Sequence, residues 1–382
     1  MNEQPRLLTQ ASVFLPEDAT WMAQAHRLAA RGLYTTDPNP RVGCVLVREG
    51  ELVGVGFHVQ AGGPHAEVHA LTQAGEKARG ATAYVTLEPC SHHGKTPPCA
   101  DALIAAGVSR VVVAMEDPNP QVSGKGLAKL RDAGIETAVG LMAEETARLN
   151  PGFIKRMREG LPWVRIKLAM SLDGRTAMAS GESQWITGKA ARLDVQRLRA
   201  RSSAVLTGIG TVLSDDPSMD VRVDADFLGA SAAPHQPLHA IVDARLLTPA
   251  NSRILYSCDK VLIFHAPTAL GCSTHYPRQV ELIEVQEDNG YLGLRGVLAR
   301  LAEHEVNECH VEAGSKLAGG LLETGLVDEI IVYMAPHLMG DSAHGLFHLP
   351  TLSSMRDRIG LHIEDIRPVG RDWRITARVE HE

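Results

Sequence analysis

Hydrophobic and polar positions follow one another in helix-like and strand-like periods along the first 160 residues. Asp18 can cap a helix that runs to about Arg31, since apolar residues recur there on one face. A hairpin is expected where two apolar runs flank Glu49-Gly50-Glu51. Strands are expected at 42–47, 52–57, 81–87, 110–115 and 135–139, and further helices at 65–75, 98–106, 126–133 and 143–157. This alternation predicts a three-layer α/β domain.

Gly160-Leu161-Pro162 interrupts the pattern, and we place a domain boundary there, giving domains of 1–160 and 161–382. The second half also mixes strand-like and helix-like segments, which predicts a second α/β domain with its own core. Because the pattern Gly-x-Gly-x-x-Gly is missing, a conventional doubly wound dinucleotide-binding domain is not favoured. Strands are expected at 163–170, 203–207, 238–242, 261–264, 308–312, 329–334 and 373–379, helices at 188–200, 292–302 and after 314, and a loop at 214–237.

Composition excludes several classes of protein. A net charge of -7 and an aromatic content of 4% argue against a nucleic-acid binder with a broad basic or stacking surface. No apolar run approaches the roughly 18 residues of a membrane span, and the first fifteen residues do not resemble a signal peptide. Six cysteines in 382 residues do not suggest a disulfide framework, so we expect a cytoplasmic protein. Four of them are expected to be ordinary core or surface residues, namely Cys44, Cys258, Cys272 and Cys309.

The richest chemistry lies between residues 65 and 99. His65-Ala66-Glu67 is followed by Pro89-Cys90 and then by Cys99, so one imidazole and two thiols are available as zinc ligands. Three protein ligands leave the fourth tetrahedral position for water, as in catalytic zinc sites. This order, with a glutamate two residues past the histidine, is typical of zinc deaminases of nucleobases. Glu67 is then the proton carrier, and the predicted reaction converts C–NH2 to C=O on a pyrimidine-like ring.

Two alternatives stay open for these residues. A structural zinc would need a fourth ligand, which His92 or His93 could supply, but Glu67 would then have no role. His65 could otherwise be a helix cap beside two buried thiols. Eight residues separate Cys90 from Cys99, and their donors and cations suit an anionic group on the substrate.

The stretches from Asp37 to Cys44 and from Pro89 to Cys99 resemble those of the bifunctional riboflavin-biosynthesis deaminase/reductase family, and the resemblance covers nearly the whole chain. It implies a cytidine-deaminase-like first domain that deaminates 2,5-diamino-6-(5-phosphoribosylamino)pyrimidin-4(3H)-one. It also implies that His65, Cys90 and Cys99 bind zinc and that Glu67 shuttles the proton. The positions where this family holds the pyrimidine and the ribose phosphate are Asn39, His58, His92 and Lys95.

Three stretches of the second half resemble the reductase domain of the same family, which has a dihydrofolate-reductase-like fold: 167–187, 208–222 and 311–320. The resemblance implies hydride transfer from NADPH to C1 of the ribosyl group, which becomes ribityl phosphate. At Gly314 a strand meets a helix, so free N–H groups can hold a pyrophosphate, although tight packing alone would also call for glycine. The implied cofactor contacts are Ala169, Trp185, Thr211, Asp215, Gly314, Ser315, Lys316, Leu317, Ala318, Gly319 and Gly320. The implied substrate contacts are Lys167, Ser183, Arg199, Met219, Arg222 and Glu312, with Arg199 and Arg222 on the phosphate.

Two other functions remain as hypotheses. The chain could be a deaminase of a nucleoside or tRNA whose second half only binds, or a non-catalytic scaffold stabilised by zinc. Net charge and the long loop between the cysteines count against tRNA. We expect a homo-oligomer, either dimer or tetramer, and assign no function to residues 224–237 and no residue to the choice of NADPH over NADH.

Overall fold

The computed structural model describes residues 14–91, 98–120, 122–269, 275–288 and 290–381. The chain forms two compact units, one made of Met1–Asn150 with Ala230–Ala232 and the other of Pro151–Gly229 with Ala233–Glu382. The predicted boundary at residue 160 differs from this division by the helix α6 (Pro151–Glu159), which belongs to the second unit, and by Ala230–Ala232, which belong to the first. Among the residues described, no helix has both the length and the apolar character needed to cross a membrane.

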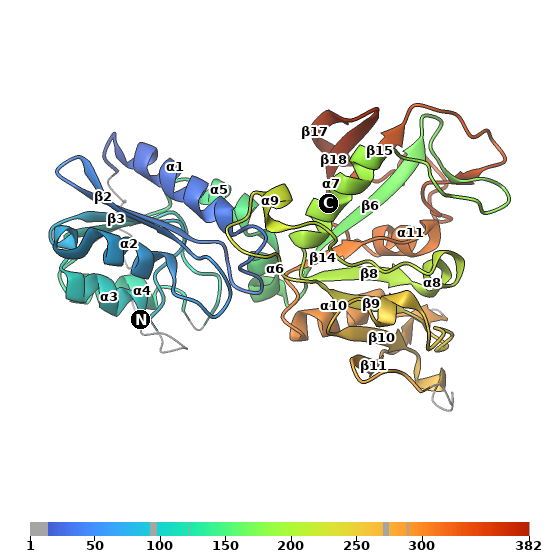
Figure 1. Ribbon diagram of the computed structural model, residues 1–382, viewed down its shortest axis with the longest axis horizontal. Helices are drawn as coiled ribbons and strands as arrows, with labels where there is room; N and C mark the ends of the chain where they lie inside the picture. Colours follow the sequence, from blue (N-terminus) through green and yellow to red (C-terminus); the bar gives the residue numbers. More distant parts are fainter. Residues whose placement is uncertain (1–13, 92–97, 121, 270–274, 289, 382) are drawn as a thin grey trace, which may run out of the picture. The chain divides into compact units, whose positions relative to one another are not determined.

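The first unit is built on a five-stranded sheet in the order β2-β1-β3-β4-β5. β1 pairs antiparallel with β2 and β3, whereas β3, β4 and β5 are parallel. Helices α2, α3 and α4 lie on one side of the sheet and α1 on the other (Figure 1). The elements are α1 (Asp18–Ala29), β1 (Gly43–Arg48), β2 (Glu51–Phe57), α2 (Ala66–Ala74), β3 (Thr82–Val85), α3 (Cys99–Ala106), β4 (Arg110–Val113), α4 (Lys125–Asp132), β5 (Glu136–Val139) and α5 (Ala143–Leu149). The predicted three-layer arrangement is confirmed.

Glycines in β2 allow α2 to lie directly on the sheet. A Cβ atom at Gly56 would be 2.1 Å from the carbonyl oxygen of Ala66, and one at Gly54 would be 2.3 Å from that of Ala70. Any larger residue would therefore push away the first turns of the helix that follows His65.

A buried ion pair stabilises the opposite side of this unit. The carboxylate of Asp18 is fully buried and accepts hydrogen bonds from the Leu15 N–H, the Tyr84 hydroxyl and two nitrogens of Arg110, at 2.8–2.9 Å. Burial acts to raise the pKa of Asp18, but the bonds from Arg110 and the other donors hold it below its ordinary value. Asp18 therefore stays ionised inside the α1 layer.

The second unit contains a nine-stranded sheet in the order β11-β10-β9-β8-β14-β6-β15-β18-β17. Neighbours from β11 to β15 are parallel, and β18 and β17 close the sheet antiparallel. Side chains of α10 and α11 pack on one face of the sheet, and those of α7 and α8 pack on the other. Its main elements are β6 (Trp163–Ser171), α7 (Lys189–Ala200), β8 (Ala204–Gly208), α8 (Ile209–Asp215), α9 (Ala225–Leu228), β9 (Leu238–Val242), β10 (Val261–His265), β11 (Val280–Glu284), α10 (Leu294–Glu303), β14 (Glu308–Val311), α11 (Ser315–Glu323), β15 (Glu329–Ala335), β17 (Leu361–Val369) and β18 (Asp372–Val379).

Some predicted elements were wrong. The single helix expected at 143–157 is two helices, α5 and α6, because Pro151 has no N–H to continue a helix and disfavours the helical conformation at Asn150. The segment expected as a loop after residue 214 contains the short helix α9, capped by Asp224. Strands that the pattern did not predict are β7 (Arg175–Ala177), β11, β12 (Glu287–Asp288), β13 (Tyr291–Leu292), β16 (His344–Gly345) and β17.

Candidate active sites

The structure brings together the three predicted zinc ligands. His65 precedes α2, Cys90 follows β3, and Cys99 is the first residue of α3. The Nδ1 atom of His65 lies 3.3 Å from the sulfur of Cys99 and 3.6 Å from that of Cys90. One donor atom from each residue lies within 4.8 Å of the other two. A zinc ion fits this set because tetrahedral sites take thiolate and imidazole donors that converge on one point.

The site already stabilises the thiolate form of one of its two cysteines, Cys90. The facing Cys99 thiol is the main cause that lowers the pKa of Cys90 to about 4, whereas the pKa of Cys99 is raised by the Cys90 sulfur. The backbone N–H of Cys99 also donates a hydrogen bond to the Cys90 sulfur at 3.3 Å. Thiolate is the species that binds a metal, so Cys90 is already in its ligating form.

Glu67 lies in the first turn of α2, and only 3% of the residue is exposed. Burial raises the pKa of Glu67 to about 7. The carboxyl group is therefore shielded from bulk water. It lies in the helical turn that directly follows the zinc ligand His65.

Two of the residues predicted to bind the substrate of the deaminase are linked to each other and to this site. The Asn39 amide donates a hydrogen bond to His58 Nε2 at 3.0 Å, and His58 Nδ1 donates to the carbonyl oxygen of Pro64, also at 3.0 Å. Burial lowers the pKa of His58, so the ring is neutral and accepts the bond from Asn39. The His58 ring packs edge-on against His65, with the ring centroids 5.4 Å apart. The other two predicted contacts, His92 and Lys95, lie outside the described residues.

The second candidate site lies where β8 and β14 end, beside the middle of β6. Val311 of β14 pairs with Ile166 of β6 and with Leu206 of β8, so the next residues along the three strands lie side by side. These are Lys167, Thr207 and Glu312. The carboxyl ends of parallel strands are where α/β proteins bind ligands.

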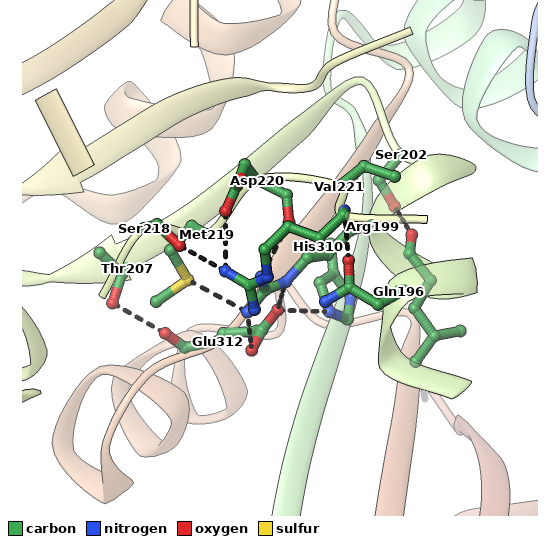
Figure 2. Close-up of polar contacts among 12 residues, drawn as sticks. Gln196, Arg199, Ser202, Thr207, Ser218, Met219, Asp220, Val221, His310 and Glu312 are labelled. Atoms are coloured by element: carbon green, nitrogen blue, oxygen red, sulfur yellow. Dashed lines mark hydrogen bonds and ion pairs between the residues drawn. The ribbon is translucent and has the colours of Figure 1, made fainter. Parts of the chain in front are cut away.

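Glu312 is the centre of a buried polar network (Figure 2). Its carboxylate accepts two hydrogen bonds from Arg199 of α7, at 2.5 and 3.0 Å. His310 Nε2 lies 3.3 Å from the same carboxylate, and the Thr207 hydroxyl donates to the Glu312 carbonyl at 2.8 Å. Burial acts to raise the pKa of Glu312, but Arg199, followed by His310 and Lys167, holds it well below the ordinary value. Glu312 therefore remains an anion here.

The other predicted substrate contacts surround this network. Arg199 also donates to the Asp220 carbonyl at 3.1 Å, and its second terminal nitrogen lies 3.9 Å from the sulfur of the buried Met219. Burial lowers the pKa of Lys167. The Arg222 side chain is 54% exposed and pairs with Asp220 at 2.8 Å. Ser183 lies on the loop before α7, and no hydrogen bond connects it to the network among the residues described.

The predicted cofactor contacts occupy three places around the same edge. Ala169 is in the final part of β6, Thr211 and Asp215 are in α8, and Gly314 precedes the first turn of α11. Within the run from Gly314 to Gly320, Ala318 is fully buried, and a Cβ atom at Gly319 would be 2.0 Å from the carbonyl oxygen of His348. The later part of this run therefore serves helix packing, which leaves its exposed first turn for a ligand.

Trp185 lies apart from these strand ends in sequence, on the loop before α7. Its side chain is 68% exposed, and the Arg192 guanidinium lies 4.4 Å from the ring centroid. The contact restrains the ring by a cation–π interaction.

Two residues with a clear place in these sites were not predicted from the sequence. His310 supports Glu312, and Glu88 is buried immediately before Pro89-Cys90. The available signal was an ionisable residue beside apolar ones: His310 lies between Cys309 and Val311, and Glu88 directly follows the strand predicted at 81–87.

Comparisons with known proteins agree with this division of sites. A family model described as the cytidine and deoxycytidylate deaminase zinc-binding region matches residues 15–115, and one described as the RibD C-terminal domain matches residues 162–375. The chain is 51% identical to the riboflavin biosynthesis protein RibD of Escherichia coli, over 93% of this chain and 98% of the relative. It is 49% identical to the protein of the same description from Haemophilus influenzae, over 95% and 98%.

Solved structures lead to the same relatives. The structure of RibD from Acinetobacter baumannii is similar with a TM-score of 0.86 and 44% identity, over 96% of this chain and 99% of that one. A Thermotoga maritima diaminohydroxyphosphoribosylaminopyrimidine deaminase/5-amino-6-(5-phosphoribosylamino)uracil reductase matches with a TM-score of 0.82 and 34% identity, over 95% and 98%.

Proposed function

Because the chain belongs to the RibD family of bifunctional riboflavin-biosynthesis enzymes, we propose which of its residues carry out each of the two reactions. The chain is a deaminase and a reductase of riboflavin biosynthesis that uses zinc and NADPH. Its first unit has the cytidine-deaminase-like fold and its second unit the dihydrofolate-reductase-like fold of that family. The expected enzyme class, fold and cofactors are thereby confirmed. The two alternative functions, a deaminase without a reductase and a non-catalytic zinc scaffold, are excluded.

We assign the deamination to the site at the start of α2. The observation that carries this assignment is the convergence of His65, Cys90 and Cys99 within 4.8 Å, with Glu67 buried one turn away. When bound, zinc supplies a Lewis acid that makes water nucleophilic at neutral pH. Glu67 takes the proton that water loses as its oxygen bonds to the carbon that carries the amino group. Glu67 passes this proton to the ring nitrogen. It then takes the second proton from the hydroxyl now bound to carbon and passes it to the amino group, whose bond to carbon breaks to release ammonia and leave C=O.

The substrate of this step is the phosphoribosylated diaminopyrimidine. Asn39 and His58 would hold the pyrimidine, a proposal supported by their mutual hydrogen bond and by the contact between the rings of His58 and His65. His92 and Lys95 would hold the ribose phosphate, since histidine and lysine suit an anionic group.

We assign the reduction to the place in the second sheet where β8 and β14 end beside β6. NADPH supplies the hydride, which adds to C1 of the ribosyl group; the bond from C1 to the ring oxygen breaks, and that oxygen takes a proton. Lys167, Ser183, Met219 and Glu312 would position the sugar. Arg222, which is half exposed, would bind the phosphate together with Arg199, although the Arg199 guanidinium also holds Glu312. The cofactor would lie against Ala169, Trp185, Thr211, Asp215 and the run from Gly314 to Gly320.

A coupled assay tests the two-step function. Purified protein is expected to release ammonia from the diaminopyrimidine and then to oxidise NADPH in a one-to-one ratio, because the first product is the second substrate. NADPH absorbance and ammonia are measured together. The reductase assignment would be contradicted if the protein releases ammonia but does not oxidise NADPH, even when the deaminated intermediate is added directly.

We also propose that the functional form is a homo-oligomer in which a second copy covers the outer hairpin β17–β18. Leu361, Ile363, Ile366 and Trp373 lie on one face of this hairpin and are each 44–54% exposed. An exposed apolar face at a sheet edge favours association. Ile363→Asp is expected to lower the mass measured by sedimentation, whereas Leu52→Asp, at an equally exposed leucine of the first unit, leaves it unchanged. A monomeric wild-type protein at micromolar concentration would contradict the proposal.

A further inference from the structure

Glu88 is a buried carboxylate that is not one of the groups assigned to either reaction. It lies at the end of the segment that follows β3, and only 4% of it is exposed. Its carboxylate accepts hydrogen bonds from four backbone N–H groups: Asp117 at 3.2 Å, Gly124 at 2.9 Å, Gly126 at 2.9 Å and Leu127 at 3.2 Å. A buried carboxylate satisfied by four main-chain donors fixes the backbone on both sides of the contact.

The bonds to Gly126 and Leu127 cap a helix from outside its own sequence. These residues belong to the first turn of α4, whose own N-cap, Gly124, provides no side-chain hydrogen bond. The first N–H groups of a helix need partners, and an anion is favoured at this end of the helix dipole. Glu88 therefore supplies the missing cap of α4.

Gly126 brings α4 into contact with the residue next to the zinc ligand. A Cβ atom at Gly126 would lie only 2.0 Å from the carbonyl oxygen of Pro89 and 3.1 Å from a carboxylate oxygen of Glu88. The main chains of α4 and of Glu88-Pro89 thus touch, and no side chain larger than hydrogen fits between them.

Cys90 follows directly and is held from two sides. On its carboxyl side, its carbonyl oxygen accepts a hydrogen bond from the Ala100 N–H at 3.1 Å, and its sulfur accepts one from the Cys99 N–H at 3.3 Å. On its amino side, the restraint is the contact of Glu88 and Pro89 with α4. The position of the sulfur thus depends on two helix amino termini, those of α3 and α4.

We propose that Glu88 is a positioning residue for the zinc ligand Cys90, and that Gly126 is the helix residue through which it acts. The inference rests on the assignment of Cys90 as a zinc ligand. Glu88 touches neither zinc nor substrate; it fixes the backbone from which the Cys90 thiolate reaches the metal. Groups that orient a ligand in this way typically change metal affinity by about 10- to 100-fold when they are replaced.

The test is the rate at which the full-length zinc-loaded protein releases zinc to a chromogenic chelator, well below its melting temperature. Glu88→Gln keeps the size of the side chain but turns two amide hydrogens toward backbone donors, so we expect release to be about 10-fold faster or more. Gly126→Ala, which leaves Glu88 in place and displaces Pro89, is expected to act in the same direction. In cobalt-substituted protein, both variants should weaken the thiolate-to-metal absorption.

Asp18→Asn is the matched control. Asp18 is also a buried carboxylate with four hydrogen bonds in this unit, but it lies in the α1 layer on the opposite side of the sheet from α2, α3 and α4. We expect it to lower the melting temperature without changing zinc release or the cobalt spectrum. Circular dichroism reports whether the first unit of each variant is folded, and NADPH-dependent reduction reports whether the second unit is intact.

The outcomes separate the proposal from its premise. Wild-type release rates in both Glu88→Gln and Gly126→Ala would overturn the positioning role, as would equal acceleration in Asp18→Asn, which would point to general destabilisation. If Cys90→Ser binds zinc as tightly as the wild type, the ligand assignment itself fails.

Discussion

Glu67→Gln is expected to lower the rate of ammonia release by about 10²- to 10⁴-fold, the usual contribution of a general acid–base group. The amide cannot accept the proton that water gives up or return it to the leaving amino group. Because Glu67 is not among the three converging donor residues, the variant should bind one equivalent of zinc, as the wild type does. Ammonia release and zinc content are measured on the same preparation.

The reductase provides an internal control for this variant. Reduction of pre-formed deaminated intermediate is expected to continue at the wild-type rate, since Glu67 belongs to the first unit. Glu76→Gln, at an exposed glutamate just after α2, should leave both activities unchanged. Ammonia release that survives Glu67→Gln at near wild-type rate would remove the assigned role of this residue.

Glu312→Gln is expected to have the opposite effect to Glu67→Gln: the variant loses reduction and retains deamination. In the wild type the buried Arg199 guanidinium donates two hydrogen bonds to the Glu312 carboxylate. The neutral amide of the variant cannot balance the charge of this guanidinium. Leaving a buried charge without its partner costs about 3–5 kcal/mol. A cost of this size in the transition state corresponds to a loss of about 10²- to 10⁴-fold in kcat/KM. The measurement is NADPH oxidation with pre-formed intermediate, over a range of substrate concentrations.

A surface glutamate of the same unit is the control for this second variant. Glu303 pairs with Arg300 on the exposed side of α10, so Glu303→Gln should leave reduction unchanged. Retained ammonia release by Glu312→Gln would show that the first unit is intact, and a circular dichroism spectrum like that of the wild type would show that the second unit is folded. A kcat/KM for reduction within about threefold of the wild type would contradict the placement of the sugar beside Glu312.

The zinc site could be predicted from the sequence because its parts are local. His65 and Glu67 are two residues apart, and Cys90 and Cys99 are close in sequence, so residue types and order were enough. Their positions at the starts of α2 and α3 followed from the hydrophobic periods on either side.

The reductase site depends on the pairing of distant strands, which no local pattern specifies. Arg199 and Glu312 meet because β14 lies between β6 and β8, although β14 comes more than a hundred residues after both. Resemblance to a family named both residues, but not their ion pair or the contact from His310. The strand β17 was missed because most of its side chains are exposed and its polar and apolar residues mix.

The central claim is that one chain holds two independent sites, a zinc-dependent deaminase and an NADPH-dependent reductase. The most direct test is to remove zinc with a chelator and then to measure both activities, with circular dichroism to show that the chain remains folded. The account predicts that ammonia release disappears and returns on addition of zinc, while reduction of pre-formed intermediate continues at its original rate. Loss of both activities in the folded, zinc-free protein would contradict it.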